Sequence, residues 1–330
     1  MPPDLIAINA VLIAVRQAAH VLCDRATLLV LLHAHGGACR FAEFSEQTGL
    51  ASRLQSSRLA QLTEDGLLVR IPYSRRPLRH AYHLTHMGVA LFDVLALLIT
   101  WEQVWPGPEG LNTKAQVVHL ACKPVRGRST GATTVHLHCA SCHEPVTPRD
   151  VALRLSHTEM AKMPAKGTLT RRTSQDTSLK PGDSMTPVTQ GLAVLGDKWS
   201  IEVLVCAFFG LRQFGDFGKS LGISTNILTD RLVRLVDAGL FRRSTDDEAH
   251  RKGVYLLTSK GRDFYAILIA IQSWADEWID HRVRSPVKLR HRPCEKVLEP
   301  LIVCDACGQA VTHMQAKVVI DLHQPLPESF

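Results

Sequence analysis

The chain contains the same unit twice. A shift of 173 positions aligns its two halves without a gap, over about 80 residues, and an internal repeat of this kind sets the architecture before any other feature. Uncommon residues coincide at this offset. The matches are Asp24 with Asp197, Phe41 with Phe214, Phe44 with Phe217, Arg58 with Arg231, Gly66 with Gly239, Tyr82 with Tyr255, Thr85 with Thr258, Gly88 with Gly261, Trp101 with Trp274 and Trp105 with Trp278. The chain is therefore a tandem duplication of one domain.

The second copy has the pattern of a winged helix-turn-helix. Residues 201–209 are almost all apolar, which predicts a helix buried on several sides. Phe214 and Phe217 lie three positions apart, as in a short amphipathic helix. Ser224 can cap a third helix, which Gly239 ends because glycine accepts a left-handed backbone at low cost. A basic hairpin follows, so the order is three helices and a wing.

Several motifs carry a resemblance to a known family. They are Asp197-Lys198-Trp199, Gly222-Ile223-Ser224, Leu228-Thr229-Asp230-Arg231-Leu232, Ala238-Gly239-Leu240, Leu257-Thr258, Gly261 and Trp274. In this order they resemble the HxlR-type transcriptional regulators, which are dimeric winged-helix proteins related to the MarR group. The resemblance implies a DNA-binding regulator. The first copy departs from the pattern, because Arg25-Ala26 stands where the family usually has Lys-Trp.

Length and composition agree with a globular protein of several domains. The chain has 330 residues, of which 45% are hydrophobic, and its mean hydropathy is +0.02, so it is neither disordered nor membrane-spanning in character. The apolar run Leu5 to Val15 lacks a basic segment before it and is too short to cross a bilayer. We interpret it as the opening helix of the first winged domain, the counterpart of Pro187 to Leu195. We therefore expect a cytoplasmic, nucleoid-associated protein.

These patterns predict an α+β fold that is mainly α. We expect winged helix-turn-helix domains at 1–110 and 187–285, zinc-ribbon-like modules at 111–157 and 286–330, and a flexible linker at 158–186, which is rich in Ser, Thr, Pro and Lys. The linker is long enough to let any two parts of the chain pair. No phosphate-binding glycine loop, nucleophile elbow or carboxylate pair stands out, so an enzyme is not expected.

The net charge of +7 suits a polyanion as partner, and the charge concentrates on the two predicted wings. Polar side chains of helix 3 in each copy can meet base edges in a major groove, while arginines there and on the wings can neutralise phosphates. We expect double-stranded DNA to be contacted by Arg53, Gln55, Ser56, Arg58, Arg70, Arg75, Arg76, Arg79, Ser224, Thr225, Asn226, Thr229, Arg231, Arg234, Arg242, Arg243, Arg251 and Lys252. The competing interpretation is a protein-interaction or transcription-assembly module with little sequence-specific DNA binding.

Each winged copy is followed by a cluster of histidine and cysteine. The first is His119-x2-Cys122 with Cys139-x2-Cys142, and the second is His291-x2-Cys294 with Cys304-x2-Cys307. Two tight turns that each supply two ligands are what a tetrahedral zinc site requires, so we expect one structural zinc ion per copy. A redox dithiol and cysteines without a ligand role remain alternatives. The histidine of the first site is open as well, because His136, His138 and His143 lie nearby.

Long apolar helices end both winged copies, at Gly88 to Trp105 and Gly261 to Ile279. They are apolar on more faces than a small domain covers alone, and the resemblance to dimeric regulators implies a dimer seam. The seam can close within one chain as a pseudo-dimer or between two chains as a homodimer. Among the remaining cysteines, Cys206 is expected to be a buried small hydrophobe. Some HxlR-type regulators resemble thiol or aldehyde sensors that carry a reactive cysteine near the first helix, and Cys23 lies at that place.

Overall fold

A computed structural model of the chain describes residues 5–106, 115–122, 132–155, 190–244, 253–279 and 287–320. The chain forms two compact units, and each of them takes segments from both halves of the sequence. Unit 1 contains Met1–His20, Leu137–Arg171 and Asp197–Leu301, and unit 2 contains Val21–His136, Arg172–Gly196 and Ile302–Phe330. The predicted linker lies outside the described residues.

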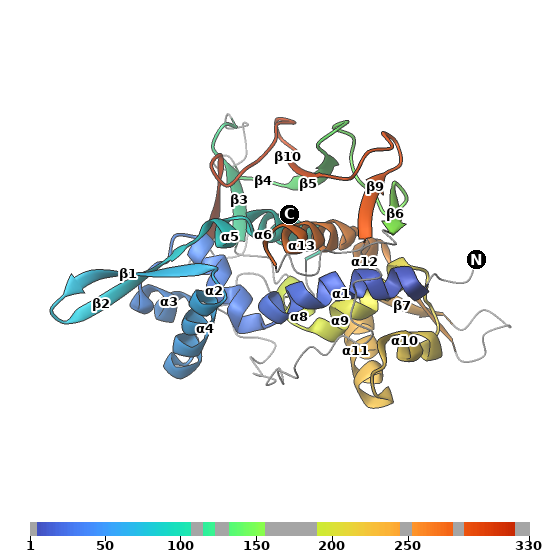
Figure 1. Cartoon of the computed structure of the whole chain (residues 1–330), viewed down its shortest axis with the longest axis horizontal. Helices are drawn as coiled ribbons and strands as arrows, with labels where there is room; N and C mark the ends of the chain where they lie inside the picture. The colour runs from blue at the N-terminus through green and yellow to red at the C-terminus, as the bar shows by residue number, and fades with distance from the viewer. Residues whose placement is uncertain are drawn as a thin grey trace, which may run out of the picture. The chain divides into compact units, whose positions relative to one another are not determined.

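Unit 2 holds the first winged domain (Figure 1). Its helices and strands are α2 (Arg25–His35), α3 (Phe41–Thr48), α4 (Ser52–Glu64), β1 (Leu68–Arg75), β2 (Leu78–Leu84), α5 (His86–Val89) and α6 (Phe92–Val104). β1 and β2 pair antiparallel and form the wing. The third helix that the sequence predicts in this copy is confirmed as α4, which lies between the caps Ala51 and Asp65.

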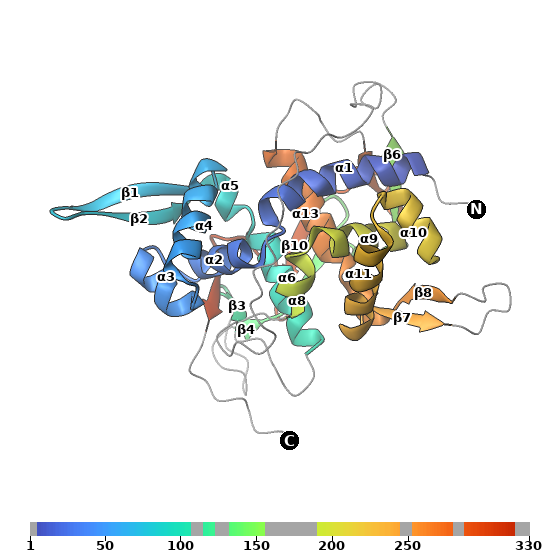
Figure 2. The same ribbon diagram turned by 90° about the horizontal axis from the view of Figure 1, so that it is seen from below.

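Unit 1 holds the second winged domain in the same order (Figure 2). It consists of α9 (Lys198–Phe208), α10 (Phe214–Leu221), α11 (Thr225–Asp237), β7 (Phe241–Ser244), β8 (Val254–Leu257), α12 (Ser259–Asp263) and α13 (Tyr265–Trp278). The side chain of Ser224 accepts a hydrogen bond from the Ile227 amide, and Gly239 has φ +74°. The predicted cap and stop of the third helix are therefore confirmed.

The glycine that follows each wing is required by a close approach of backbones. A Cβ on Gly88 would meet the Leu67 carbonyl oxygen at 2.3 Å, and one on Gly261 would meet the Leu240 oxygen at 2.2 Å. In both copies a threonine, Thr85 or Thr258, caps the short helix that begins there. Any side chain at these two positions would push helix and wing apart, which explains why the repeat keeps them.

The N-terminal helix α1 (Leu5–Leu22) does not stay with the copy that follows it in sequence. Its residues up to His20 belong to unit 1, where the Arg16 guanidinium lies 2.8 Å from the carboxylate of Glu202 on α9. We expected this helix to open the first winged domain. That expectation is wrong, because most of the helix belongs to the unit that holds the second winged domain. Glu202 is only 2% exposed, and its buried carboxylate is paired with a cation from the other copy, which offsets the cost of burying the charge.

The counterpart helix α8 (Gln190–Leu195) is exchanged in the opposite direction and belongs to unit 2. Its first two amides donate to one buried carboxylate, that of Glu102 on α6, at 2.9 Å from Gln190 and 2.7 Å from Gly191. A carboxylate at a helix N-terminus satisfies free amides and complements the helix dipole. The two units thus exchange their opening helices within one chain.

The tail strands follow the same exchange. In unit 1, β6 (Val151–Leu155) pairs antiparallel with β9 (Val287–His291). In unit 2, β11 (Ala316–Ile320) pairs antiparallel with β3 (Ala115–His119), which also pairs with β4 (Ala132–Thr133). Two further strands, β5 (Val135–Cys139) and β10 (Pro300–Cys304), each run from one unit into the other. The tail modules are therefore built from both halves of the sequence, and not from 111–157 and 286–330 separately.

One helical stretch among the described residues, His86–Val104, is long and apolar enough to cross a membrane, but 67% of it is buried inside the protein. Burial of this kind is expected for a core helix. Nearly every residue of α6 is buried, from Phe92 to Glu102.

Candidate nucleic-acid interface and candidate metal centres

The third helix of each winged domain presents a polar, exposed face. On α11, Thr225, Asn226, Thr229 and Arg234 are exposed, while Leu228, Leu232 and Leu235 are buried beneath them. Ser224, which caps the helix, is exposed too. This face is held by its apolar stripe and is free to meet a ligand.

On α4 the matching exposed residues are Arg53 and Ser56, which align with Asn226 and Thr229. Arg53 is a donor that can bond the guanine edge, and Asn226 can bond the adenine edge. The two copies therefore present different side chains at equivalent exposed positions.

Two arginines that we expected on phosphates are engaged inside the protein instead. Arg58 lies with its Nε 2.6 Å from the Asp24 carboxylate, and Arg231 lies 2.6 Å from Asp197 in the same way. Each aspartate also caps the helix that it precedes, by accepting from the Thr27 or Ser200 amide. Arg58 and Arg231 therefore connect the third helix of each winged domain to the start of α2 or α9, and their contact with phosphate stays a prediction.

Gln55 was predicted to meet a base edge, and this prediction is wrong. The side chain is 0% exposed, and its amide nitrogen donates to the Phe41 carbonyl at 2.7 Å. Its oxygen lies 3.5 Å from the hydroxyl of Thr48. The sequence held the signal for this, because Gln55 aligns with Leu228, a core residue of the second copy.

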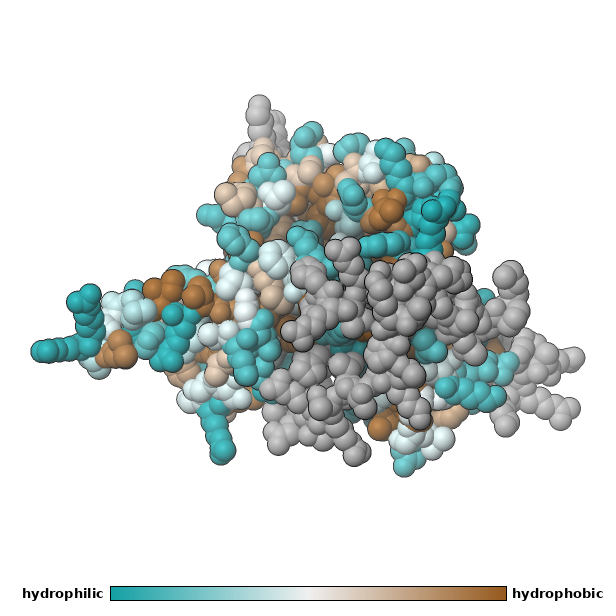
Figure 3. All heavy atoms as spheres, viewed as in Figure 1, coloured by the Kyte–Doolittle hydropathy of each residue, from teal (hydrophilic) through white to brown (hydrophobic). Residues whose placement is uncertain are grey.

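The first wing is a long basic hairpin (Figure 1). Arg70, Arg75, Arg76 and Arg79 are all exposed, and their contact with DNA stays a prediction. Hydrophilic residues gather at the tip of the arm formed by β1 and β2, and hydrophobic ones lie along it (Figure 3).

A further cation beside this wing was missed by the sequence analysis. The guanidinium carbon of Arg40, the residue before α3, lies 5.0 Å from the centroid of the Tyr73 ring on β1. Arg40 aligns with Gln213 in the other copy, so the comparison of the two copies gave no signal for it.

The second wing is described only at its base, by β7 and β8 (Figure 2). Arg242 and Arg243 are exposed on β7. The other two cations predicted on this wing, Arg251 and Lys252, lie outside the described residues.

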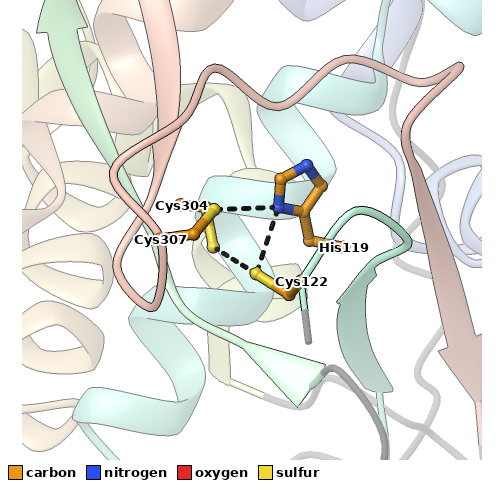
Figure 4. Close-up of side chains that lie close together, drawn as sticks. All are labelled: His119, Cys122, Cys304 and Cys307. Atoms are coloured by element: carbon orange, nitrogen blue, oxygen red, sulfur yellow. Dashed lines mark hydrogen bonds between the residues drawn. The ribbon is translucent and has the colours of Figure 1, made fainter. Parts of the chain in front are cut away.

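A cluster of one histidine and three cysteines lies in unit 2 (Figure 4). Nδ1 of His119 lies 3.3 Å from the sulfur of Cys122 and 3.4 Å from that of Cys307. The sulfurs of Cys122 and Cys304 are 3.5 Å apart. All four ligand atoms lie within 4.8 Å of one another, and these cysteines are free thiols.

Unit 1 contains the second cluster of the same composition. Nδ1 of His291 lies 3.3 Å from the sulfur of Cys142 and 3.5 Å from that of Cys294, and the sulfurs of Cys139 and Cys294 are 3.9 Å apart. Both histidines are almost completely buried, and among the described residues Nε2 of each has no hydrogen-bond partner. Each ring is therefore oriented by the cysteines that face its Nδ1.

The eight predicted ligand residues thus come together, but in different sets from those we expected. The sequence favoured a site within each copy, whereas each cluster joins a His-x2-Cys turn of one copy to a Cys-x2-Cys turn of the other. Strand pairing is the physical reason. β3 leads into His119 and pairs with β11, which follows Cys307, and β9 leads into His291 and pairs with β6, which follows Cys142.

The nearby histidines lie outside both clusters. Nε2 of His136 is 2.8 Å from the Asp305 carboxylate, and Nδ1 of His138 is 2.7 Å from the His143 carbonyl oxygen. His143 itself occupies the left-handed region with φ +62°, as do Glu295 and Gly308 after the last cysteine of their turns. These residues shape the turns and leave His119 and His291 as the histidines of the clusters.

One cysteine in each cluster is set up to ionise. The Lys296 amide lowers the pKa of Cys294 to about 7 against the effect of burial. Burial opposes ionisation of Cys304, yet hydrogen bonds from Thr133 and Cys122 and from two backbone amides lower its pKa to about 6. Thiolates are the form of cysteine that binds metal ions. Cys206, by contrast, is fully buried, which raises its pKa to about 12, so the prediction of a small buried hydrophobe is confirmed.

Comparison with known proteins matches residues 21–109 and 194–283, more than half of the chain, to a family described as HxlR-like helix-turn-helix. An uncharacterised HTH-type transcriptional regulator of Mycobacterium tuberculosis strain H37Rv is 38% identical over 128 residues, which cover 38% of this chain and 79% of that protein. One from Synechocystis is 35% identical over 95 residues, 28% of this chain and 70% of that protein. A solved structure of a candidate transcription factor from Pseudomonas aeruginosa has 33% identity and a TM-score of 0.31, covering 38% of this chain and 86% of that one.

Proposed function

Because this chain belongs to the HxlR-like helix-turn-helix family and is a DNA-binding transcriptional regulator rather than an enzyme, we propose that α4 and α11 enter major grooves of its operator. The observation that carries the proposal is the pair of exposed polar helix faces, each locked to its domain by an aspartate–arginine pair. A rigid helix with its polar side outward is how helix-turn-helix proteins present side chains to bases. As a regulator of genes the protein would act in the cytoplasm, at the nucleoid.

Within this interface, base contacts and phosphate contacts fall to different residues. Base edges would be read by Arg53, Ser56, Ser224, Thr225, Asn226 and Thr229, all of which are exposed. Phosphates would be met by Arg234 and by the exposed wing residues Arg70, Arg75, Arg76, Arg79, Arg242 and Arg243. Arg251 and Lys252 belong to the second wing by sequence and join this group as an expectation. Base contacts set specificity, while phosphate contacts set affinity and its salt dependence.

Two single substitutions on α11 test this assignment against an operator obtained by selection from random DNA. Asn226→Ala should relax the preference at one base pair by about 1–3 kcal/mol and leave the salt dependence unchanged. Arg234→Gln should weaken binding to every sequence alike and reduce the slope of log K against log salt by about one. Equal losses on operator and random DNA for both variants would contradict the assignment.

The two clusters, each of one histidine and three cysteines, are proposed to hold structural zinc ions. Zinc bonds of about 2.3 Å to sulfur and about 2.0 Å to nitrogen in a tetrahedron separate two sulfurs by about 3.8 Å and a sulfur from a nitrogen by about 3.5 Å. The separations within the clusters are 3.5 and 3.9 Å between sulfurs and 3.3 to 3.5 Å between sulfur and nitrogen. The residues present therefore fit this ion. Four protein ligands leave no open position, so the ion's role is to hold the fold.

Metal analysis of the purified chain tests the zinc proposal. We expect two zinc ions per chain, and a strong chelator should unfold the tail strands while leaving α2–α4 and α9–α11 folded, because each ion contributes its binding free energy to the tail alone. Far-ultraviolet circular dichroism and hydrogen exchange of the two regions provide the readouts. A metal-free chain with intact tail strands would overturn the proposal and would favour a redox dithiol.

A further inference from the structure

The ligands of each cluster come from both halves of the sequence. In unit 2, His119 and Cys122 belong to the first half and Cys304 and Cys307 to the second. In unit 1 the roles are reversed, with Cys139 and Cys142 from the first half and His291 and Cys294 from the second. Neither half therefore contains a complete set of four ligands for either cluster.

We propose that the two metal ions are clasps that tie the first half of the chain to the second, in addition to the peptide link between them. The inference rests on the proposed binding of metal at these clusters, and it adds to that proposal what the metal is for. A sequence-local site would stabilise one tail module. An exchanged site instead makes the association of the halves depend on the metal.

Hydrogen bonds around the clusters support a joint closed by both halves. The Ala140 amide, next to Cys139, donates to the Glu299 carbonyl within unit 1 at 2.9 Å. The Asp305 amide, next to Cys304, donates to the Thr134 carbonyl within unit 2 at 3.1 Å. The backbone beside each Cys-x2-Cys turn thus bonds to the other half of the sequence, as the ligands do.

The packing that surrounds the clusters makes the same exchange. β6 of the first half pairs with β9 of the second in unit 1, and β11 of the second half pairs with β3 of the first in unit 2. Each pairing covers five residues of either strand. The β6–β9 sheet has two strands, and the β11–β3 pairing is extended only by the short strand β4. Small sheets of this kind are marginal in water without a further constraint. A metal ion at one end of each sheet would supply that constraint, because it fixes the turn of one strand to the turn of its partner.

Matched double variants of the full chain distinguish exchanged sites from local ones. Cys122→Ser with Cys304→Ser removes two ligands from one exchanged site, so this variant should keep one of its two zinc ions. Cys122→Ser with Cys139→Ser damages both exchanged sites, so this variant should lose both ions. Sites closed within each copy predict the reverse, with two ions lost from the first variant and one from the second. Loss of both ions from the Cys122→Ser, Cys304→Ser variant together with loss of one ion from the Cys122→Ser, Cys139→Ser variant would overturn the clasp.

A cut chain then tests whether the metal holds the halves together. A specific protease site inserted between Met163 and Lys180 allows the folded full chain to be cleaved in two, and native mass spectrometry follows the fragments with and without a zinc chelator. We expect the fragments to stay together with zinc and to associate at least about 100-fold more weakly once it is removed. A change below about tenfold in a chain that does bind two zinc ions would refute the clasp.

These results keep the two proposals apart. Absence of zinc from the unmodified chain would count against the metal centres themselves. Two bound ions combined with the local loss pattern, or with fragments that ignore the chelator, would leave the metal centres standing and remove only the clasp.

Discussion

Replacement of Arg231 by glutamine should destabilise the second winged domain while leaving the salt dependence of DNA binding unchanged. Arg231 lies on the recognition helix, where an arginine is usually assigned to phosphate. Its guanidinium is instead 2.6 Å from Asp197, the residue that caps α9. It also contacts its neighbour Asp230. Arg234 on the same helix is 55% exposed and provides the matched control.

The size of the effect follows from the burial of the pair. Removal of one partner from a fully buried ion pair costs about 3–5 kcal/mol, whereas an exposed pair contributes about 0–1 kcal/mol. The side chains of Arg231 and Asp197 are each 18% exposed, and Asp197 keeps its bonds from the amide and hydroxyl of Ser200. We therefore expect a loss of about 2 kcal/mol, which is about a 30-fold increase in local opening. The Arg234–Asp230 pair should contribute only about 0.3–0.5 kcal/mol.

Hydrogen exchange of the amides in α9–α11 measures this opening directly, and binding to one DNA fragment at several salt concentrations measures the phosphate contact. Arg231→Gln should raise the exchange rates about 30-fold and keep the salt slope. Arg234→Gln should leave exchange almost unchanged and lower the slope by about one. Unchanged exchange together with a reduced slope for Arg231→Gln would refute the reasoning.

Two further predictions concern buried polar groups of the first copy. Gln55→Ala should lower the stability of unit 2 by about 1–3 kcal/mol, because it leaves the Phe41 carbonyl without its donor. The base preference on selected DNA should not change. A changed preference would indicate that Gln55 contacts DNA. Burial lowers the pKa of His33 and that of His35 to about 4, and His313 adds a small lowering at His35. Below the unfolded-state histidine pKa of about 6.5, the unfolded chain binds more protons than the folded one. The contribution of these histidines to the free energy of unfolding is therefore full above pH 6.5 and is lost as the pH falls toward 4. The loss should reach about 3 kcal/mol per residue. The aligned positions in the other copy are Cys206 and Phe208. Between pH 7 and pH 5 the protection factors for hydrogen exchange should therefore fall more in α2 than in α9, and an equal fall would contradict the assignment.

Local features of this fold could be predicted because their causes lie close together in the sequence. The third helices, the Ser224 cap and the glycine after each wing depend on helical periodicity and backbone freedom within a few residues. The eight residues of the clusters were predictable for the same reason, since each turn supplies two ligands at fixed spacing.

The differences at the predicted DNA interface share one origin: the chemical type of a side chain was given more weight than its position on the helix. Gln55 lies four residues before Leu59 and seven before Leu62, both buried, and therefore belongs to the apolar stripe of its helix. Arg58 aligns with Arg231, and the aspartates that precede them in the sequence, Asp24 and Asp197, align as well. That repeated pair of opposite charges predicts an internal contact as well as it predicts a phosphate contact.

The partners of the exchanged segments could not be predicted, because any His-x2-Cys turn satisfies any Cys-x2-Cys turn equally well. Only strand pairing over long sequence separations decides between them, and the two copies have tail strands of similar composition. The long segment between the halves gave no constraint either, since its reach permits every pairing.

The exchange of the opening helices explains why the two copies have diverged where they have. Glu202, which binds Arg16 of α1, aligns with Leu29, and Glu102, which binds the first amides of α8, aligns with Ala275. Each carboxylate is buried in one copy and has no counterpart in the other. If α1 and α8 changed places, Glu202 would lose Arg16, whose aligned residue in the sequence is an uncharged threonine, and α1 would have to fit Ala18 where Gly191 now allows Glu102 to approach. A buried carboxylate without its partner costs several kcal/mol. The two anchors therefore make each helix specific for one unit, which a duplicated chain requires if it is to fold to a single arrangement.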